Sequence, residues 1–150
     1  MTNKSKDIGT KAETATVKAV KPRGFPLMER RQLMGTYDRG DLTGYPKICF
    51  QVKGGHYAWN ASDLKIEEWM AAMERQRIQA DATVGLLVVQ RKGVGLSNAH
   101  RWWAYMWASQ LSGDPRDRFP TRMLLDAALV WLRKAGYGEP LTEQELAKAS

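Results

Sequence analysis

Residues 40–53 read GDLTGYPKICFQVK, and this stretch decides the fold. Over residues 47–53 apolar and polar side chains alternate, so one face carries Ile48, Phe50 and Val52. A period of two indicates a strand with one buried face. The Gly-Tyr-Pro triplet directly before the strand predicts a tight turn. We therefore expect the chain to turn back on itself here and to continue as a half-buried strand.

The opposite face of this strand carries polar side chains, among them Gln51 and Lys53. The turn brings Asp41 toward that face, so a carboxylate, an amide oxygen and an ammonium group share one patch. Hard oxygen ligands suit Mg²⁺, which takes few protein ligands and keeps several waters. A lysine beside such a site can help to deprotonate a water or hold a phosphate oxygen. The patch fits metal-assisted hydrolysis of a phosphodiester.

The flanking sequence supplies both helices and strands. An apolar stripe from Ile66 to Met73 predicts an amphipathic helix, with Asn60 or Ser62 as its N-terminal cap. Residues 84–89 form an apolar run typical of a central strand covered on both faces. We therefore expect an α/β fold in which helices flank a central mixed β-sheet.

Caps and helix breakers predict the other elements. Thr10 can cap a first helix, which Pro22 and Gly24 end. Three more elements are expected: a short strand at 25–34, a strand at 101–107 and an amphipathic helix at 121–135. The chain then divides into a flexible basic arm at 1–9, a single nuclease-like domain at 10–135 and a C-terminal tail at 136–150.

Length and charge restrict the class of protein. The 150 residues suit one compact domain. Lys and Arg number 23 against 16 Asp and Glu, and the resulting net charge of +7 favours a polyanionic partner such as nucleic acid. Cys49 is the only cysteine, which excludes an internal disulfide and a cysteine-cluster zinc site. His56 and His100 are the only histidines, so a histidine-rich metal site is not expected.

The sequence also bears on location. Residues 1–10 are polar and lack an apolar core, so no secretory signal is expected. No run of about 18 apolar residues occurs, so no membrane span is expected. We expect a cytoplasmic protein, or one in the host cell cytoplasm if a phage encodes it.

Four short motifs follow one another along the chain. They are Gly-Thr-x-x-Glu at 9–13, Gly-Asp-Leu at 40–42, Gly-x-Pro at 44–46 and the strand at 49–53. In this order and spacing they resemble the PD-(D/E)XK nuclease superfamily, and more narrowly the archaeal-type Holliday-junction resolvases and their bacteriophage relatives. The resemblance covers residues 9–107 and implies a restriction-endonuclease-like core.

Carried over residue by residue, the resemblance implies a Mg²⁺ site in which Mn²⁺ can substitute. The implied metal ligands are Glu13, Asp41, Gln51 and the backbone carbonyl of Val52. Lys53 would orient or activate the attacking water, and Gln90 is a further candidate for positioning that water. The implied catalytic residues are Glu13, Asp41, Gln51 and Lys53.

One position departs from the family pattern. The family usually has Glu or Asp where this chain has Gln51. A glutamine can still bind a metal through its side-chain oxygen, but one negative charge is lost and metal affinity should fall. Two outcomes stay open: an active enzyme with weak Mg²⁺ binding, or an inactive DNA-binding descendant.

Basic side chains near the candidate site can form a phosphate-binding rim. They are Arg30, Arg31, Arg39, Lys47, Lys65, Arg91 and Lys92. His56, just after the motif strand, is a further candidate for contact with phosphate, although it also fits a loop histidine without a role. A solvated charged surface is the competing interpretation of the basic residues.

Aromatic residues gather on one later strand. Trp103, Tyr105 and Trp107 share one face, and Trp102 lies on the other. Burial in a core or a dimer interface is the favoured interpretation, and stacking on unpaired bases is the alternative. Resolvases of this type act as symmetric homodimers, so the strand at 102–107 and the C-terminal helix are candidates for the interface.

The expected function is therefore that of a homodimeric, Mg²⁺-dependent, structure-selective DNA endonuclease that resolves four-way junctions by phosphodiester hydrolysis. A nicking or double-strand DNA endonuclease of the same fold is one alternative. A catalytically weak or inactive module for DNA binding or assembly is the other. The neutral Gln51 keeps this last alternative open.

Overall fold

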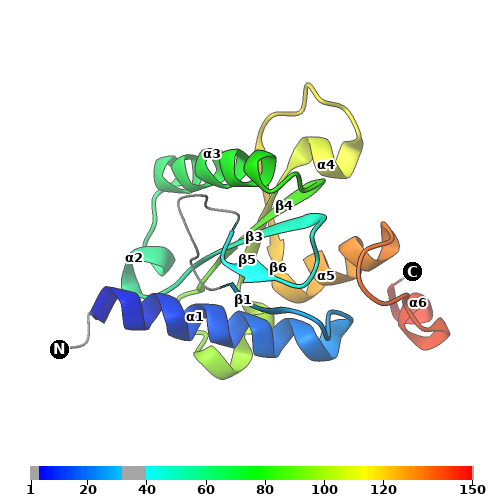
Figure 1. Cartoon of the computed structure of the whole chain (residues 1–150), viewed down its shortest axis with the longest axis horizontal. Helices are drawn as coiled ribbons and strands as arrows, with labels where there is room; N and C mark the ends of the chain where they lie inside the picture. Colours follow the sequence, from blue (N-terminus) through cyan, green and yellow to red (C-terminus); the bar gives the residue numbers. More distant parts are fainter. Residues whose placement is uncertain (1–3, 32–39, 150) are drawn as a thin grey trace.

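The computed structural model describes residues 4–31 and 40–149 (Figure 1). Its α-helices are α1 (Lys4–Val20), α2 (His56–Trp59), α3 (Asp63–Gln79), α4 (Ala108–Ser112), α5 (Leu125–Lys134) and α6 (Glu143–Ala149). Its 3₁₀ helices are η1 (Lys21–Arg23) and η2 (Leu96–Arg101). Its strands are β1 (Glu29–Arg30), β2 (Leu42–Thr43), β3 (Ile48–Lys53), β4 (Val84–Val89), β5 (Trp103–Trp107) and β6 (Pro120–Leu124). Within these ranges no helix has the length and apolar character needed to cross a membrane.

A four-stranded sheet in the order β3-β4-β5-β6 forms the centre of the molecule. β3 and β4 are parallel and the other neighbours are antiparallel, so the sheet is mixed. α3 connects β3 to β4, as a parallel pair needs a crossover between its strands. β1 and β2 form a separate antiparallel pair. The predicted α/β fold, with helices flanking a mixed sheet, is confirmed.

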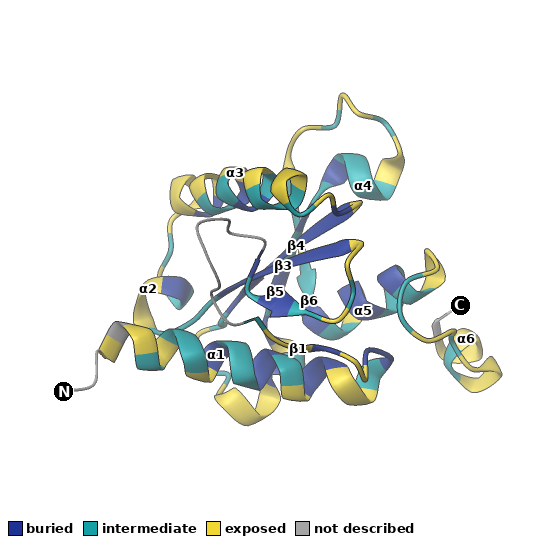
Figure 2. Ribbon diagram, in the orientation of Figure 1, coloured by how far each residue is buried: buried dark blue, intermediate teal, exposed yellow. Residues whose placement is uncertain are grey.

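The first face of the sheet packs against α1, η2 and α5. Ile48, Phe50 and Val52 point into this core, as their alternation predicts. The expectation of a half-buried strand is wrong, because the other face of β3 is covered too and Cys49 and Gln51 are buried. Trp102, between η2 and β5, is fully buried in the same core. Figure 2 shows β3 and β4 as buried ribbons between two layers of helices. This face therefore provides the main apolar core of the protein.

The second face packs against α3. The predicted helical stripe is confirmed, because Ile66, Met70 and Met73 are buried against Leu87 and Val89. The predicted cap is confirmed as well, since the side chain of the residue before α3 accepts a hydrogen bond from its first turn. On β5, three aromatic residues at alternate positions pack beside this cluster and stay half-buried, namely Trp103, Tyr105 and Trp107.

The start of the first helix differs from the prediction. α1 begins at Lys4, so the expectation of a flexible arm is wrong for residues 4–9, and Thr10 is not the cap. Tertiary packing accounts for the longer helix. The Ile8 side chain lies so close to Gly55 that an added Cβ there would be 2.5 Å from its Cγ2. Residues 1–3 lie outside the described chain.

The helix expected at 121–135 is wrong in its first turn. Residues 120–124 form strand β6, which pairs with β5, and the helix begins at Leu125. The buried side of α5 carries Leu125, Ala128, Leu129 and Leu132. Pairing with β5 therefore decides where the strand ends and the helix begins.

The tail expected at 136–150 contains an ordered helix, α6. Arg133 of α5 holds it through hydrogen bonds to both carboxylate oxygens of Glu145, at 2.5 and 3.1 Å. The same guanidinium donates to the carbonyl oxygens of Glu139 and Pro140. Because the Arg133 side chain is only 7% exposed, this ion pair docks the tail on the domain.

Candidate functional site

Asp41 lies against the outer edge of β3. Its backbone amide donates to the Phe50 carbonyl at 2.8 Å, and the Val52 amide donates to Asp41 Oδ2 at 2.7 Å. On the other side, the Arg31 amide donates to the Asp41 carbonyl at 2.9 Å. The prediction that the turn brings Asp41 to the motif strand is confirmed, whereas a patch shared with the Gln51 and Lys53 side chains stays a prediction.

The turn at residues 44–46 makes this approach possible. Gly44 has φ +117°, a conformation that favours glycine. A Cβ at this position would lie 2.2 Å from the Leu27 carbonyl oxygen. The Tyr45 hydroxyl accepts a hydrogen bond from the Leu27 amide at 3.2 Å, and the Tyr45 carbonyl accepts from the Ile48 amide at 2.9 Å. These contacts fix the turn, and with it the position of Asp41.

The backbone of β3 adds a second oxygen to this edge. The Lys53 carbonyl accepts from the Gln90 amide and so points across the sheet toward β4. Backbone groups of successive strand residues alternate in direction. The Val52 carbonyl therefore points to the same side as the Val52 amide, toward Asp41. The implied ligands Asp41 and Val52 thus lie on one edge of the sheet.

Gln51 is buried without full hydrogen bonding. Within the described ranges the buried polar side chains are Gln51, 4% exposed, and Thr16, 0% exposed. Thr16 donates to the Ala12 carbonyl, whereas Gln51 Nε2 has no partner. An unsatisfied buried amide costs stability, so folding alone does not explain this residue. Gln51 belongs to β3, two residues before Lys53 and one residue before Val52, whose amide contacts Asp41.

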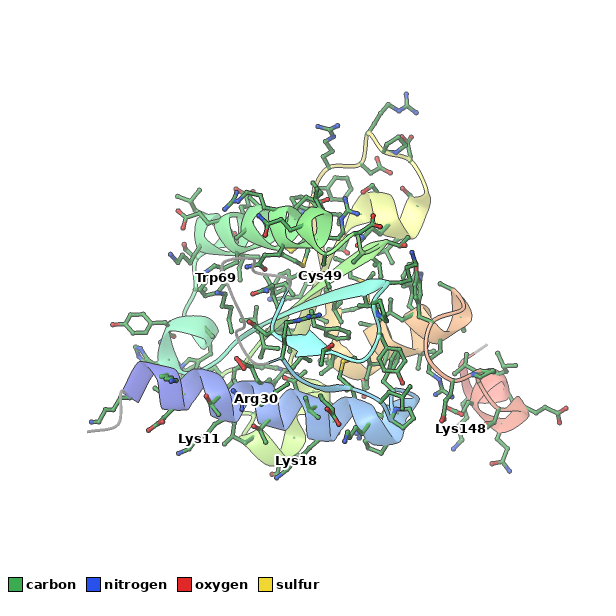
Figure 3. The ribbon with its side chains drawn as sticks, in the orientation of Figure 1. Lys11, Lys18, Arg30, Cys49, Trp69 and Lys148 are labelled. Carbon is green, nitrogen blue, oxygen red and sulfur yellow. The ribbon has the colours of Figure 1, made fainter. Side chains whose placement is uncertain are left out.

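Lys53 contributes a cation that has no acidic partner among the described residues. Its ammonium lies 5.5 Å from the ring centroid of Trp69, which points from α3 toward the sheet (Figure 3). In the part of the chain that the structure describes, Lys53 has no ion pair. Lys65 lies 5.8 Å from the same ring but also pairs with Glu68 at 3.2 Å. Lys53 therefore keeps a charge that can act on an anion.

Glu13 is engaged by a neighbouring cation. Its Oε1 accepts from Arg30 Nε at 3.3 Å, and Arg30 also reaches the Thr10 hydroxyl at 3.4 Å (Figure 3). Arg30 belongs to β1, and the next residue donates its amide to Asp41. The structure thus connects Glu13 to Asp41 through β1, but it pairs the Glu13 carboxylate with arginine.

The oxygen donors decide which metal the site suits. No three His, Cys, Asp or Glu side chains among residues 4–31 and 40–149 form a group that could hold a metal ion. The edge of β3 offers instead the Asp41 carboxylate and the Val52 carbonyl. Gln51 is buried on the face toward α3, and its side-chain oxygen is the atom that would bind a cation, since the unpartnered Nε2 is a hydrogen-bond donor. This donor set fits a hard cation that keeps most of its waters, such as Mg²⁺. With one carboxylate, its affinity should be low.

The structure gives three of the predicted rim residues distinct surroundings. Arg91 follows β4 and lies over Trp103, with its guanidinium carbon 4.5 Å from the ring centroid. Lys92 is exposed in the following turn. Arg31 is half-buried beside Asp41, and its Nε has no partner. The prediction for Arg39 falls outside the described residues.

Of two further predicted phosphate contacts, Lys47 lies at the other end of β3, whereas the role of His56 stays a prediction. Lys47 immediately precedes β3, and six strand steps of about 3.3 Å separate it from Lys53 by about 20 Å. Lys47 therefore does not flank the Lys53 end of the strand. His56 opens the short helix α2, where it is exposed and bonded to the Asn60 side chain at 2.9 Å.

Gln90 holds the chain just beyond β3. Its Oε1 accepts a hydrogen bond from the Gly55 amide at 2.8 Å. Its own amide donates to the Lys53 carbonyl at 2.9 Å. Gln90 therefore fixes the turn after the motif strand, and its oxygen is already engaged. Its predicted part in positioning water stays a prediction.

Sequence reasoning missed two residues of this region. Trp69 was expected only as part of an apolar stripe, yet two lysines lie near its ring. Arg122 was expected on a helix, whereas it lies on β6 with its guanidinium carbon 4.0 Å from the Trp103 centroid. A Lys65 one helical turn before Trp69 was a readable signal. For Arg122 no such signal existed, because strand pairing brings it to Trp103.

Comparison of the chain with models of known protein families, with characterised proteins and with solved structures finds no match. The family resemblance rests on the four sequence motifs. The chemistry of the site is therefore inferred from Asp41, Gln51, Val52 and Lys53 and from their contacts.

Proposed function

We propose that the protein is a Mg²⁺-dependent DNA endonuclease that hydrolyses phosphodiester bonds at the outer edge of β3. The hydrogen bond from the Val52 amide to Asp41 Oδ2 carries this proposal. It places a carboxylate beside a strand whose next residue, Lys53, has a cation without an acidic partner in the described chain. We propose four-way junctions as the substrate, because the order of the four sequence motifs resembles that of junction resolvases.

Each residue has a definite part in this proposal. Asp41, Gln51 and the Val52 carbonyl would hold the cation, which supplies a water of lowered pKa and offsets negative charge on the phosphate. Lys53 holds a phosphate oxygen and orients the attacking water. Its position over the Trp69 ring limits the directions that the ammonium can take. The net charge of +7 favours binding of the polyanionic substrate.

Cleavage of a labelled four-way junction, measured across a Mg²⁺ and Mn²⁺ titration, tests the proposal. Asp41→Asn keeps an oxygen for the Val52 amide but removes the charge, and Lys53→Met removes the cation. Each should lower the cleavage rate about a hundredfold or more, since each removes several kcal/mol of transition-state stabilisation. Lys65→Met is the matched control, because Lys65 shares the Trp69 ring but pairs with Glu68.

Two results would contradict the proposal. Undiminished cleavage by Asp41→Asn would remove Asp41 from the chemistry. Equal losses for Lys53→Met and Lys65→Met would mean that packing on Trp69, and not the Lys53 charge near the site, controls the rate. Parallel assays on nicked, flap and linear duplex DNA separate junction resolution from nicking or double-strand cleavage.

A module that binds DNA without cutting it is the second candidate. One observation favours it: the described residues hold no cluster of three acidic, histidine or cysteine ligands, and Glu13 pairs with Arg30. Gln51→Glu separates the candidates because it restores the carboxylate that the family usually has. Faster cleavage at lower Mg²⁺ supports the enzyme. Tight junction binding without cleavage, in both the native protein and Gln51→Glu, supports the module.

The proposed enzyme is a homodimer, because paired cuts in a four-way junction need two sites related by symmetry. Trp102 is fully buried within one chain and so is not available for such an interface. The rest of that strand stays a candidate, since Trp103, Tyr105 and Trp107 are half-buried, and so does α5, although its apolar side already faces the core. Sedimentation of the free protein and of the junction complex measures the number of chains in each.

A further inference from the structure

The second face of the sheet is covered only in part. α3 buries Leu87 and Val89 on β4, whereas Trp103 and Tyr105 on β5 are half-buried. The last strand, β6, is an edge strand with intermediate or exposed residues along its whole length. The β5–β6 half of this face is thus the less buried part, which a partner can reach.

Two arginines gather on one aromatic ring in this open half. The guanidinium carbon of Arg122 lies 4.0 Å from the Trp103 ring centroid, and that of Arg91 lies 4.5 Å from it. Both distances fall within the range of cation–π attraction. In the described part of the chain neither arginine has an acidic partner. Arg91, Trp103 and Arg122, hereafter the arginine–tryptophan stack, form a fixed pair of uncompensated charges.

Strand register connects this stack to the candidate site. Lys53 is paired with Val89, and Val89 is paired with Trp103. Paired residues point to the same face of a sheet, and neighbouring strands lie about 4.8 Å apart. Lys53 and Trp103 therefore project from one face at a separation of about 10 Å. The two cations of the stack continue the positive charge of Lys53 across the sheet.

We propose that the arginine–tryptophan stack binds the phosphate backbone of the nucleic acid next to the cleavage site. This inference rests on the proposed function and names the surface on which its substrate lies. A guanidinium on an aromatic ring keeps its edge N–H groups free, and these groups suit phosphate oxygens. Because the ring already holds both arginines, less of its area is left for a base. The stack therefore recognises backbone, independently of sequence.

A second copy of this chain is the other occupant to consider. If two copies met with this stack near the twofold axis, Arg91 and Arg122 of one would approach the same arginines of the other. Like charges brought together at an interface oppose association. A polyanion instead compensates all of them and releases condensed counterions. The charge of the face thus favours nucleic acid over self-association.

Fluorescence anisotropy of the full-length protein with a labelled four-way junction, in EDTA and at several KCl concentrations, tests this inference. The double variant Arg91→Gln/Arg122→Gln should lower the slope of log affinity against log salt by about 2, because each phosphate contact contributes about 0.9. Arg91→Lys/Arg122→Lys keeps both charges and should keep most of the slope. Arg101→Gln is the matched control, since Arg101 is exposed on η2, in the opposite layer.

The outcomes separate the two proposals. An unchanged slope in the glutamine double variant overturns the inference, while cleavage that depends on Asp41 still supports the nuclease. A reduced slope in a protein that never cuts DNA supports the inference and rejects the nuclease. No binding by the native protein rejects both. Altered sedimentation with unaltered DNA binding would make the face a contact between copies and would also overturn the inference.

Discussion

The two faces of the central sheet are built in different ways. The face toward α1 and α5 buries apolar side chains along most of its length. Among the described residues its buried polar side chain is Thr16 on α1, which is bonded within its own helix. The face toward α3 is fully buried only beneath α3. Beside α3 it carries cations that lie over aromatic rings. It also contains Gln51, whose Nε2 has no partner in the described chain. The difference separates a face built almost entirely from apolar contacts from one that also carries cations and a buried amide with an unpartnered nitrogen.

This contrast explains why the candidate site lies where it does. Alternate residues of β3 point to opposite faces of the sheet. One half of the six residues therefore packs in the core, and the other half faces α3 and includes residues of the candidate site. Ile48, Phe50 and Val52 anchor the strand, and a firmly held strand can keep Gln51 and Lys53 in position. The unsatisfied amide of Gln51 lowers the stability of the protein, and the well-packed face toward α1 and α5 offsets this loss.

Truncation of the anchor should have the largest effect. Phe50→Ala removes a ring that is 1% exposed, and the cavity should lower the free energy of unfolding by about 3–5 kcal/mol. Tyr105→Ala, on the half-covered face, should cost clearly less because less apolar area is lost. Urea unfolding of both variants measures the difference. Equal losses would mean that both faces contribute alike.

The turn that positions Asp41 comes next. Gly44→Ala forces a left-handed conformation on alanine and places Cβ against the Leu27 carbonyl, so it should cost at least about 1–3 kcal/mol. It should also lower cleavage by moving Asp41 away from β3. Gly136→Ala is the matched control, because Gly136 has φ +100° but open space around its Cβ. If both variants lose equal stability, the contact with Leu27 does not matter.

Removal of the buried amide should stabilise the protein. Gln51→Met keeps the volume and relieves the unsatisfied group, so the free energy of unfolding should rise by about 1–3 kcal/mol while cleavage falls. Thr16→Val removes a hydroxyl whose bond is satisfied and should lower stability by about 1 kcal/mol. A loss of stability in Gln51→Met would show that the amide supports the fold.

The smallest effect is expected at the C-terminal helix. The side-chain hydrogen bond from Arg133, with a further one from the Thr142 amide, lowers the pKa of Glu145 from 4.5 to about 2. A lowered pKa adds stability that is complete above pH 4.5 and is lost as pH falls toward 2. Thermal unfolding at pH 6 and pH 3 should therefore shift less in Glu145→Gln than in the native protein.

Glu143→Gln controls for the loss of a charge on the same helix, since Glu143 has no ion pair in the described chain. It should retain the native shift between pH 6 and pH 3. An identical pH response in Glu145→Gln and the native protein would mean that the ion pair with Arg133 adds nothing to stability.

The sequence pattern predicted an element correctly where the residues of that element alone determined its structure. The alternation at 47–53 predicted β3 and its two faces, and the stripe from Ile66 to Met73 predicted α3. The glycine and proline of the turn predicted the approach of Asp41 to β3. These signals are readable because strands and helices repeat their own geometry within a few residues.

Pattern failed where a distant segment decided the outcome. Residues 120–124 resemble the start of a helix, yet they form β6 because β5 offers them an antiparallel partner. Residues 4–9 look like a polar arm, yet they are helical where Ile8 packs on Gly55. Neither partner lies within reach of a local window, so sequence spacing alone could not reveal these contacts.

The sequence by itself therefore determined the mixed α/β class, the motif strand and the set of polar residues from which the candidate site is built. Only the tertiary structure decided what each of them meets: Asp41 with the Val52 amide, Glu13 with Arg30, and Arg122 with Trp103. The physical reason is that periodicity encodes which side of an element is buried. The choice of partner depends on strand pairing and helix packing between residues far apart in the chain.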